Sequence, residues 1–437
     1  MSTVATAQDT LGQLLRGEWV DPDSGVSLAV PIQAVAIERS LAGKEADLIA
    51  SLQLGKRIAV VSDAATREVL GKRIERELAR VAVVDSVVLP GQPHADAATA
   101  ANLRHACADA DALVAVGSGT INDLCKYAAA QDGKRYAVFA TAPSMNGYTS
   151  QNAAITVHGH KKSLLAGAPA GVFMDLAVLS AAPARLIRAG LGDSLCRSTA
   201  QADWLLSHHL FGTPFRTAPF VLLAEDEAAL LESPEALLRG DPEAMRALAR
   251  TLIFSGIGMT LCAGSYPASQ GEHLISHYVD MFAPAQRCAY FHGEQVAVAT
   301  LTMARIQEDV LAAGPPRLQS EPITEAELQR RFGAEVGESC WREFQAKWMA
   351  PEDESRLERR LADRWDAVRG SVSDAMVSAD RIGTILRRAG CPTTPEEIGL
   401  TPAFYASAVR NARFLRDRYT FLDLAAASGH RDVTALA

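Results

Sequence analysis

The stretch ALVAVGSGTINDLCKYAAAQ, residues 112–131, passes from a continuous apolar segment through Gly117-Ser118-Gly119 into a helical pattern. A segment that is apolar on both faces is typical of a buried strand in a parallel sheet. A glycine turn between such a strand and a helix lets backbone N–H groups and the helix N-terminus approach a phosphate closely. The turn is neither a complete G-x-G-x-x-G nor a Walker sequence, because Asn122 occupies the third glycine position. A phosphate-binding turn and a plain structural turn are therefore both open readings of this stretch.

The same alternation of strand and helix extends to both sides. Strands are predicted at RIAVVSD (57–63), VAVVDSVVL (81–89) and YAVFAT (136–141), with helical patterns between them. This order predicts a parallel sheet covered on both faces, with right-handed crossovers. Ligands of such sheets collect at the carboxyl ends of the strands. There TAPSMNGYTSQ (141–151) offers hydroxyl and amide groups to a pyrophosphate or a ribose. A polar loop without a ligand is the alternative.

The pattern changes after residue 150. AAITVHGHKKSLLAG (153–167) predicts a hairpin that turns at His158–His160, and AGVFMDLAVL (170–179) predicts one more strand. The remaining patterns are helical almost to the end, with helices predicted at 193–210, 243–263, 270–282, 293–312, 324–348, 353–369, 377–389 and 402–416. The sequence thus predicts an α/β fold. A Rossmann-like parallel-sheet domain over residues 1–183 is followed by an all-helical domain over 184–437, with a cleft between them.

Composition excludes several classes of function. The net charge is −8 without a strong basic block, which argues against nucleic acid as a partner. Seven scattered cysteines without a C-x-x-C pair are typical of reduced thiols rather than a disulfide framework. The N-terminal stretch lacks the pattern of a secretory signal, and no apolar run reaches the ~20 residues of a membrane-spanning helix. We therefore predict a cytoplasmic protein that does not insert into a membrane.

Three histidines stand out among ten. In SQGEHLISHYVDMF (269–282), His273 and His277 are four positions apart and so lie on one helix face, and His292 opens a further helical pattern. Catalytic zinc takes imidazole and carboxylate ligands, three from the protein, with one position open. Asp193, in RAGLGDSLCRS, is the best distant carboxylate. Glu272 precedes His273, so this is not the H-E-x-x-H of metalloproteases. Polar residues on an ordinary helix remain the alternative.

Several stretches taken together resemble one family. They are GSGTINDLCKYAA (117–129), TAPSMNGYTS (141–150), AGLGDSLCRSTAQADW (189–204), and GEHLISHYVDMF with FHGEQVAV. They resemble the sn-glycerol-1-phosphate dehydrogenases, within the superfamily of glycerol dehydrogenases, iron-type alcohol dehydrogenases and dehydroquinate synthases. NARFLRDRYTFLDLAAASG (411–429) is similar to the closing helix of that family, and the resemblance covers roughly residues 30 to 430.

The resemblance implies a role for particular residues. The metal ligands would be Asp193, His273 and His292, holding zinc or, as in some relatives, nickel. Asp123 and His277 would be catalytic and would contact the substrate, as would Lys162 and Arg197; Lys161 and the more distant Lys126 are further candidates for its phosphate. NAD or NADP would lie against Asp63, Gly117, Ser118, Gly119, Thr120, Asp123, Thr141, Ser144 and Tyr148.

The implied reaction interconverts dihydroxyacetone phosphate and sn-glycerol 1-phosphate, by hydride transfer between nicotinamide and a metal-polarised C2 carbonyl. The implied partner is this small polyol phosphate, and the implied assembly is a homo-oligomer. Two residues depart from the family pattern: Tyr266 stands where arginine is common, and Asn146 where aspartate is usual. The alternatives are a dehydrogenase of another small polyol, a lyase resembling dehydroquinate synthase, and a non-catalytic binding protein that kept the fold.

Overall fold

The computed structural model describes residues 7–283, 290–319 and 322–429. The chain forms two compact units. Unit 1 comprises Met1–Val157, Lys162–Ser194 and Arg216–Ser265, and unit 2 comprises His158–Lys161, Leu195–Phe215 and Tyr266–Ala437.

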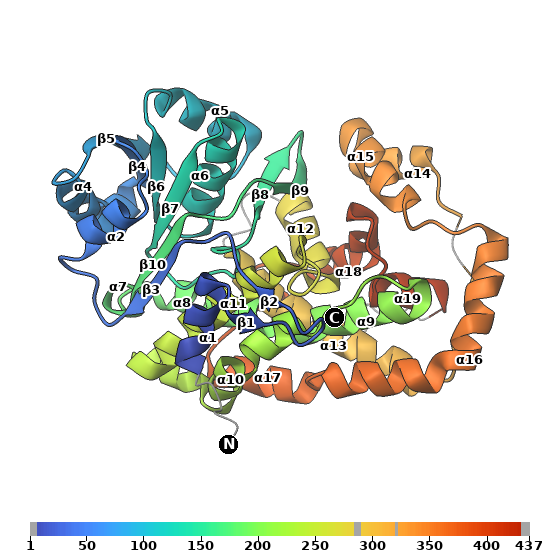
Figure 1. Ribbon diagram of the computed structural model, residues 1–437. Helices are drawn as coiled ribbons and strands as arrows, with labels where there is room; N and C mark the ends of the chain where they lie inside the picture. Colours follow the sequence, from blue (N-terminus) through green and yellow to red (C-terminus); the bar gives the residue numbers. More distant parts are fainter. Residues whose placement is uncertain (1–6, 284–289, 320–321, 430–437) are drawn as a thin grey trace, which may run out of the picture. The chain divides into compact units, whose positions relative to one another are not determined.

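Unit 1 is built on a six-stranded sheet in which every pairing is parallel (Figure 1). The strands, in their order across the sheet, are β3 (Ala34–Glu38), β10 (Gly171–Asp175), β7 (Arg135–Ala140), β6 (Ala112–Gly117), β4 (Arg57–Asp63) and β5 (Val83–Leu89). The strands predicted around residues 57, 81, 112 and 136 are confirmed as β4 to β7. The register pairs Val61 with Ala115 and Ala115 with Val138, so the apolar segment of the opening stretch lies in the middle of the sheet.

The strand predicted over residues 170–179 is only half correct. Strand β10 ends at Asp175, and Leu176–Ser180 form the helix α7. The carboxylate of Asp175 accepts hydrogen bonds from the backbone N–H groups of Ala177 and Val178, which makes it the N-cap of this helix. A cap of this kind stabilises the first helical turn, and it overrides the strand preference of the apolar residues that follow.

Helices cover both faces of this sheet. Leucine and isoleucine side chains of α2 (Glu45–Ser51), the π-helical turn Arg67–Gly71 and α4 (Lys72–Leu78) pack in one core with alternate residues of the strands. Helix α6 (Gly119–Gln131) packs on β6 and β7 and is covered by α5 (Ala97–Ala106). Figure 1 shows α5 and α6 on one side of the sheet and α2 and α4 on the other. Strand β6 is buried throughout, as a strand covered on both faces must be.

The predicted hairpin is confirmed. Strands β8 (Asn152–Val157) and β9 (His160–Leu165) form a separate two-stranded sheet. His158 and Gly159 both have positive φ, +51° and +76°. Two adjacent residues of positive φ match the twist of a tight hairpin.

Helical segments complete unit 1. They are α1 (Ala7–Arg16), the short α3 (Ala64–Thr66), α8 (Ala184–Leu195, which belongs to unit 1 up to Ser194), α10 (Ala218–Glu232), the 3₁₀ turn Pro234–Arg239 and α11 (Pro242–Leu261), beside the small antiparallel pair β1 (Trp19–Val20) and β2 (Ser27–Leu28). Helices α10 and α11 pack on each other, and α11 contacts β3 and α7. Residues 216–265 therefore belong to the compact unit that holds the sheet, although they are helical. The domain boundary at residue 183 stays a prediction.

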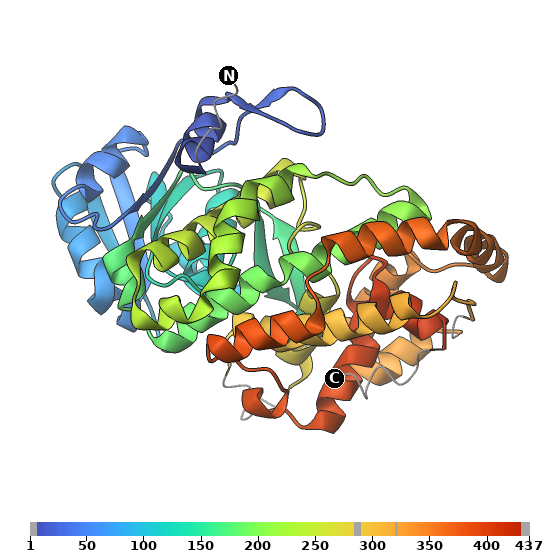
Figure 2. The same ribbon diagram turned by 90° about the horizontal axis from the view of Figure 1, so that it is seen from below.

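Unit 2 is helical apart from the hairpin tip. Its helices are α9 (Arg197–Phe211), α12 (Gly271–Phe282), α13 (His292–Ala312), α14 (Glu325–Phe332), α15 (Ala334–Gln345), α16 (Pro351–Ala375), α17 (Ala379–Arg388), α18 (Pro402–Asn411) and α19 (Phe421–Ala427), with 3₁₀ turns at Glu396–Ile398 and Ala412–Leu415. The long helix α16 packs along α9, and α13 packs against α12, α17 and α19 (Figure 2). Three predicted helices are interrupted: 193–210 at Cys196, 324–348 at Gly333, where φ is +85°, and 402–416 after Asn411.

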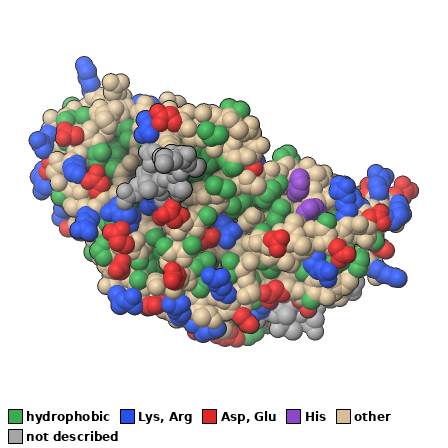
Figure 3. Space-filling view, turned by 60° about the horizontal axis from the view of Figure 1, so that its bottom comes forward, with side chains coloured by type: hydrophobic (Ala, Val, Ile, Leu, Met, Phe, Trp, Pro, Cys, Tyr) green, Lys and Arg blue, Asp and Glu red, His purple; other side chains and the backbone are tan. Residues whose placement is uncertain are grey.

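The surface carries both signs of charge. On the face drawn in Figure 3, lysine and arginine side chains are interspersed with aspartate and glutamate. Within the residues that the structure describes, we find no helix with both the length and the apolar character needed to cross a membrane.

Gly190, a helical glycine of unit 1, gives a test of how tightly that unit is packed, and Gly370, a helical glycine of unit 2, is the reference. A Cβ atom on Gly190, in α8, would lie 1.6 Å from the carbonyl oxygen of Pro143, whereas a Cβ on Gly370, in α16, would meet nothing within 4 Å. We expect Gly190→Ala to lower the free energy of unfolding by about 1–3 kcal/mol, because a backbone carbonyl has to move. Gly370→Ala should instead raise it by up to about 1 kcal/mol through helix propensity. Urea denaturation of both variants measures the difference, and equal stability of the two would contradict the packing at Gly190.

Candidate active site

The glycine turn lies at the carboxyl edge of the sheet in unit 1. Strand β6 ends at Gly117 and α6 begins at Gly119. A Cβ on Gly117 would approach Cβ of Ile121 to 2.6 Å, so only glycine fits at this position. Ser118 is the N-cap residue, yet its side chain caps no N–H group of α6. The first turn of α6, which includes Thr120, therefore presents its N–H groups without a side-chain cap from Ser118, as an anion-binding helix N-terminus requires.

The neighbouring strands bring further predicted residues to this edge. The N–H group of Thr141, just after β7, donates to the carbonyl oxygen of Gly117 at 3.1 Å. Asp63 ends β4, which is paired with β6, and its carboxylate accepts a hydrogen bond of 2.8 Å from N–H of Thr66. Asp63 thus caps the helix that follows it. The residues predicted for NAD(P) gather at the ends of three adjacent strands, which is where parallel sheets bind ligands.

Buried side chains hold the loop after β7 in place. Ser144 is largely buried, and Tyr148 is fully buried, with its hydroxyl donating to the carbonyl oxygen of Ala142 at 2.6 Å. Burial raises the pKa of the Tyr148 phenol. The hydroxyl of Tyr148 therefore serves the loop itself, and its predicted contact with the cofactor stays a prediction.

Lys126 fixes the other end of this loop. Its ammonium group is buried and donates to the carbonyl oxygens of Gly147 (2.7 Å) and Asn152 (2.9 Å) and to the hydroxyl of Ser150 (3.2 Å). Burial lowers the pKa of Lys126 to about 8, against the opposing effect of Asp123. Because its three protons point at protein acceptors, Lys126 is a structural clamp, and its candidacy as a phosphate ligand is not supported.

Asp123 and Asp193 both lie against this clamped segment. One carboxylate oxygen of Asp123 accepts from N–H of Ala154 at 3.1 Å, and the other lies 3.8 Å from Nζ of Lys126. Asp193, on α8, is buried, and its Oδ2 accepts from N–H of Asn146 at 2.7 Å. The close approach of Gly190 to the loop, one turn earlier on α8, makes this bond possible.

Three histidine rings cluster in unit 2. The ring centroid of His273 lies 5.1 Å from that of His292 and 6.1 Å from that of His277, and the other two are 6.0 Å apart. His273 and His277 come from α12 and His292 from the first turn of α13, so the helix face predicted from the sequence is completed by a second helix. His273 and His277 are both buried, with exposed fractions of 5% and 6%.

Each of two rings has a defined partner on Nδ1. Nδ1 of His273 is 2.9 Å from Oε1 of Glu272, and Nδ1 of His292 is 3.0 Å from the hydroxyl of Ser276. Glu272 also accepts from N–H of Gln270 and from the hydroxyl of Thr199. A carboxylate can only accept, so Nδ1 of His273 carries the proton and Nε2 carries the lone pair. The sequence placed Glu272 beside His273 but gave no means to assign it this role.

His277 differs from the other two. Its buried Nδ1 has no hydrogen-bond partner in the described part of the chain. Burial, reinforced by the charges of Arg416 and Lys161 and by the two other histidines, holds the pKa of His277 well below its ordinary value. His277 is therefore neutral at neutral pH, with a nitrogen available to a bound molecule.

The cationic side chains considered for the phosphate differ in whether they already bind another side chain. Lys161 forms an ion pair with Asp280, and Arg197 donates to Oε1 of Gln201 at 2.7 Å. For Lys162 and Arg416 there is no hydrogen bond or ion pair to any of the described residues. Arg416 follows the 3₁₀ turn that packs on α12, and the sequence analysis did not identify it. Its signal was present, since it lies in the C-terminal stretch LRDRYT that belongs to the family resemblance.

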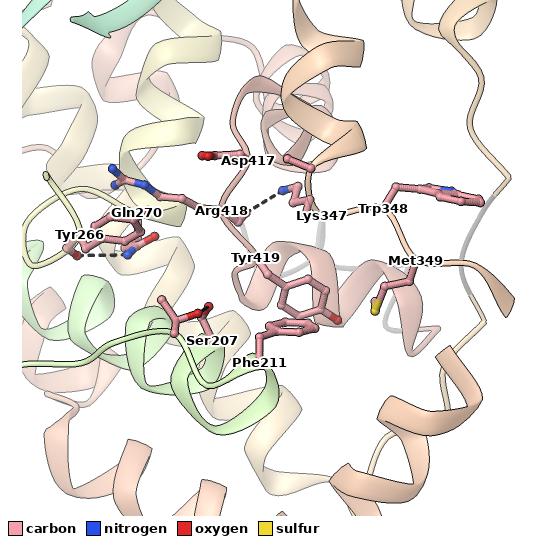
Figure 4. A pocket seen from close by; sticks show the side chains of 12 residues that line it. Ser207, Phe211, Tyr266, Gln270, Lys347, Trp348, Met349, Asp417, Arg418 and Tyr419 are labelled. Carbon is pink, nitrogen blue, oxygen red and sulfur yellow. Dashed lines mark hydrogen bonds between the residues drawn. The ribbon is translucent and has the colours of Figure 1, made fainter. Parts of the chain in front are cut away.

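Tyr266 lines a cavity of about 310 Å³ within unit 2 (Figure 4). Its ring stacks with that of Trp204 at a centroid distance of 5.9 Å, and the guanidinium carbon of Arg418 lies 4.1 Å from its centroid. Arg418 also donates to the carbonyl oxygen of Ser269. In Figure 4, Lys347 donates to the backbone carbonyl of Arg418 from the other side. The aromatic ring at position 266 thus serves as a platform for an arginine from another segment.

Known proteins resemble this chain over most of its length. Residues 36–183 match the family described as iron-containing alcohol dehydrogenase. The chain is 30% identical over 403 residues to the glycerol-1-phosphate dehydrogenase (NAD(P)+) of Bacillus subtilis (strain 168), a match that covers 91% of each protein. It is 30% identical over 304 residues to the enzyme of the same name from Pyrococcus furiosus, covering 67% of this chain and 86% of that protein.

Solved structures share the fold. Glycerol dehydrogenase from Schizosaccharomyces pombe superposes with a TM-score of 0.60 at 18% identity, over 93% of this chain and 89% of that one. NADH-dependent butanol dehydrogenase A from Thermotoga maritima gives 0.59 at 13% identity, over 94% and 98%. These likenesses confirm the predicted fold class. Since a relative of 30% identity is matched along nine-tenths of both proteins, the chain belongs to the glycerol-1-phosphate dehydrogenase family.

Proposed function

We propose that this protein is a metal-dependent NAD(P) oxidoreductase that interconverts dihydroxyacetone phosphate and sn-glycerol 1-phosphate. The observation that carries the proposal is the pair of adjacent imidazoles, His273 and His292, each with a partner on Nδ1, in a chain of this family. The names of the relatives supply the substrate and the cofactor.

The donor set suits a divalent transition metal. We assign Asp193, His273 and His292 as its protein ligands. Two imidazoles and one carboxylate leave a position open for substrate, and zinc or nickel accepts such a set. With Nδ1 of His273 bound to Glu272, the lone pair on Nε2 is the one that faces a metal. A bound metal would act as a Lewis acid on the C2 oxygen of the substrate.

The dinucleotide is assigned to the carboxyl edge of the sheet in unit 1. We propose that Gly117, Ser118, Gly119 and Thr120 hold its pyrophosphate at the N-terminus of α6. Asp63, Asp123, Thr141, Ser144 and Tyr148 would complete the site, with Tyr148 acting through the loop that it braces. The bound nicotinamide would supply or accept the hydride at C2.

Two residues are assigned to the hydroxyl groups of the substrate. We propose that neutral His277 hydrogen-bonds the C2 oxygen or a neighbouring hydroxyl and passes on the proton that reduction requires there. The buried Nδ1 of His277, for which the described residues offer no hydrogen-bond partner, supports this role. Asp123 would accept a hydrogen bond from a substrate hydroxyl or the ribose, since its carboxylate lies on α6 shortly after the glycine turn.

The phosphate of the substrate needs cationic partners. Lys162 and Arg197 keep the assignment made from the family resemblance, and we add Arg416. Its guanidinium has no ion-pair partner among the described residues, and its charge acts on His277. Lys161 is a weaker candidate for the phosphate than Lys162, because Lys161 forms an ion pair with Asp280. We further propose that the protein works as a homo-oligomer in the cytoplasm, in keeping with seven scattered cysteines that form no C-x-x-C pair.

The activity can be tested directly. Oxidation of NADH and NADPH is followed with dihydroxyacetone phosphate, dihydroxyacetone and glyceraldehyde as substrates, after chelation and after addition of zinc or nickel. We expect turnover of dihydroxyacetone phosphate that depends on added metal. His292→Ala should abolish both metal content and activity, since one ligand is lost. Absence of metal-dependent turnover with every substrate would sink the proposal, and turnover of the unphosphorylated ketones alone would sink its phosphate part.

Arg416 gives a sharper test of the phosphate assignment. A charge-assisted hydrogen bond contributes about 1.5–3 kcal/mol, so Arg416→Ala should raise KM for dihydroxyacetone phosphate by about 10- to 100-fold. KM for dihydroxyacetone, which has no phosphate, should change little. Arg410→Ala, at an exposed position on α18, is the matched control and should leave both constants unchanged. Equal effects of Arg416→Ala on the two substrates would remove Arg416 from the phosphate site.

A further inference from the structure

We propose that Asp280, Gln295 and Ser276 form a directional hydrogen-bond chain that places the proton of His292 on Nδ1 and presents Nε2 to the metal. The three are positioning residues, since none of them is assigned to the metal or the substrate. The inference rests on the proposed function for the metal itself, whereas the tautomer of His292 is a property of the protein alone.

The direction of the chain is set at Gln295. Its side-chain Nε2 lies 3.0 Å from Oδ1 of Asp280 and 3.5 Å from the carbonyl oxygen of Tyr290. A carboxylate and a carbonyl both accept hydrogen bonds and cannot donate them. The NH₂ end of the amide must therefore face these two oxygens, because the flipped amide would set oxygen against oxygen twice. The amide oxygen Oε1 then points to Ser276.

The proton on Ser276 follows from this orientation. The hydroxyl oxygen of Ser276 is 2.9 Å from Oε1 of Gln295 and 3.0 Å from Nδ1 of His292. A serine hydroxyl has a single proton, and Oε1 has none to give. Ser276 therefore donates its proton to Oε1 of Gln295. Toward His292 the hydroxyl can only accept, so Nδ1 carries a proton and the lone pair of the neutral ring is on Nε2.

The two proposed histidine ligands reach the same protonation by different means. His273 has a carboxylate directly on Nδ1, from the preceding residue Glu272. His292 is linked to the carboxylate of Asp280 through a hydroxyl and an amide. Nδ1 of His277 has no hydrogen-bond partner within the described segments, so its tautomer is not constrained in this way and His277 serves as an internal reference. Fixing the tautomer of a ligand before the metal arrives removes a cost from metal binding.

Helical spacing brings the four groups of this hydrogen-bond chain close together. Ser276 and Asp280 are one turn apart on α12, and His292 and Gln295 are one turn apart on α13, so two facing helices supply all four groups. Lys161, from the tip of the β8–β9 hairpin, forms an ion pair with Asp280. This pair keeps the carboxylate charged and in place at the far end of the chain.

The test reads the tautomer of each histidine in the full-length protein labelled with ¹⁵N-histidine. Metal is removed by chelation, and long-range ¹H–¹⁵N correlation spectra assign the proton to Nδ1 or Nε2. We expect His292 to carry it on Nδ1. Ser276→Ala should shift the His292 signals toward the Nε2-protonated or mixed form, whereas Ser276→Thr, which keeps the hydroxyl, should retain the wild-type pattern. The signals of His277 should not respond in the same way.

Metal affinity supplies the second readout. Competition of zinc with a chromophoric chelator should show affinity reduced by about 10- to 100-fold in Ser276→Ala and rescued in Ser276→Thr. If Ser276→Ala does not fold, Gln295→Leu breaks the chain at its next link and should cause the same shift. Wild-type His292 protonated on Nε2, or a tautomer unaffected by both variants, would overturn the inference. A fixed Nδ1 tautomer in a protein without dehydrogenase activity would overturn the proposed function alone.

Discussion

A buried ammonium group holds together the part of unit 1 on which the proposed cofactor site depends. The ammonium group of Lys126 is buried and donates three hydrogen bonds to the segment after β7. Loss of hydration on burial disfavours the charged form, which lowers the pKa of Lys126. Burial of a charge is tolerated when every proton is used. The same segment carries Thr141 to the glycine turn and Asn146 to Asp193. One side chain on α6 therefore links the proposed dinucleotide site to the proposed metal ligand Asp193.

Acceptor-only groups set the order of protons in unit 2. Carboxylates and carbonyl oxygens accept hydrogen bonds but cannot donate them. Glu272 therefore fixes the proton of His273 on Nδ1 directly. Asp280 does the same for His292 through the side chains of Gln295 and Ser276. His277 takes no part in these hydrogen bonds, and its Nδ1 has no hydrogen-bond partner among the residues that the structure describes. In this cluster hydrogen bonds fix the tautomers of His273 and His292, whereas the tautomer of His277 can adjust to a bound molecule. That combination suits two ligands and one proton-handling group better than it suits three equivalent ligands.

Local pattern was sufficient for much of this architecture. The strands, the glycine turn and the hairpin at His158 follow from residues close together in sequence, and their prediction was correct. The strand predicted over residues 170–179 is correct only as far as Asp175, because Asp175 caps a helix, and apolar periodicity does not reveal that cap. Spacing on one helix brought His273 and His277 together, and the residues also suggested His292 and Asp193 as candidates. Only the family resemblance assigned Asp193, His273 and His292 as the ligand set and left His277 out of it. Arg416 and the chain from Asp280 to Ser276 required knowledge of which helices face one another.

Tyr266 shows how a departure from a family pattern changes its meaning in three dimensions. Arginine is common at this position in the family, so tyrosine here removes a positive charge that could serve a phosphorylated substrate. In the structure the tyrosine ring stacks with Trp204 and contacts the guanidinium of Arg418. Cation–π attraction and the bond to the carbonyl of Ser269 hold that guanidinium against the ring. A positive charge is therefore present beside position 266, supplied by the C-terminal segment, and the tyrosine by itself is no argument against a phosphorylated substrate.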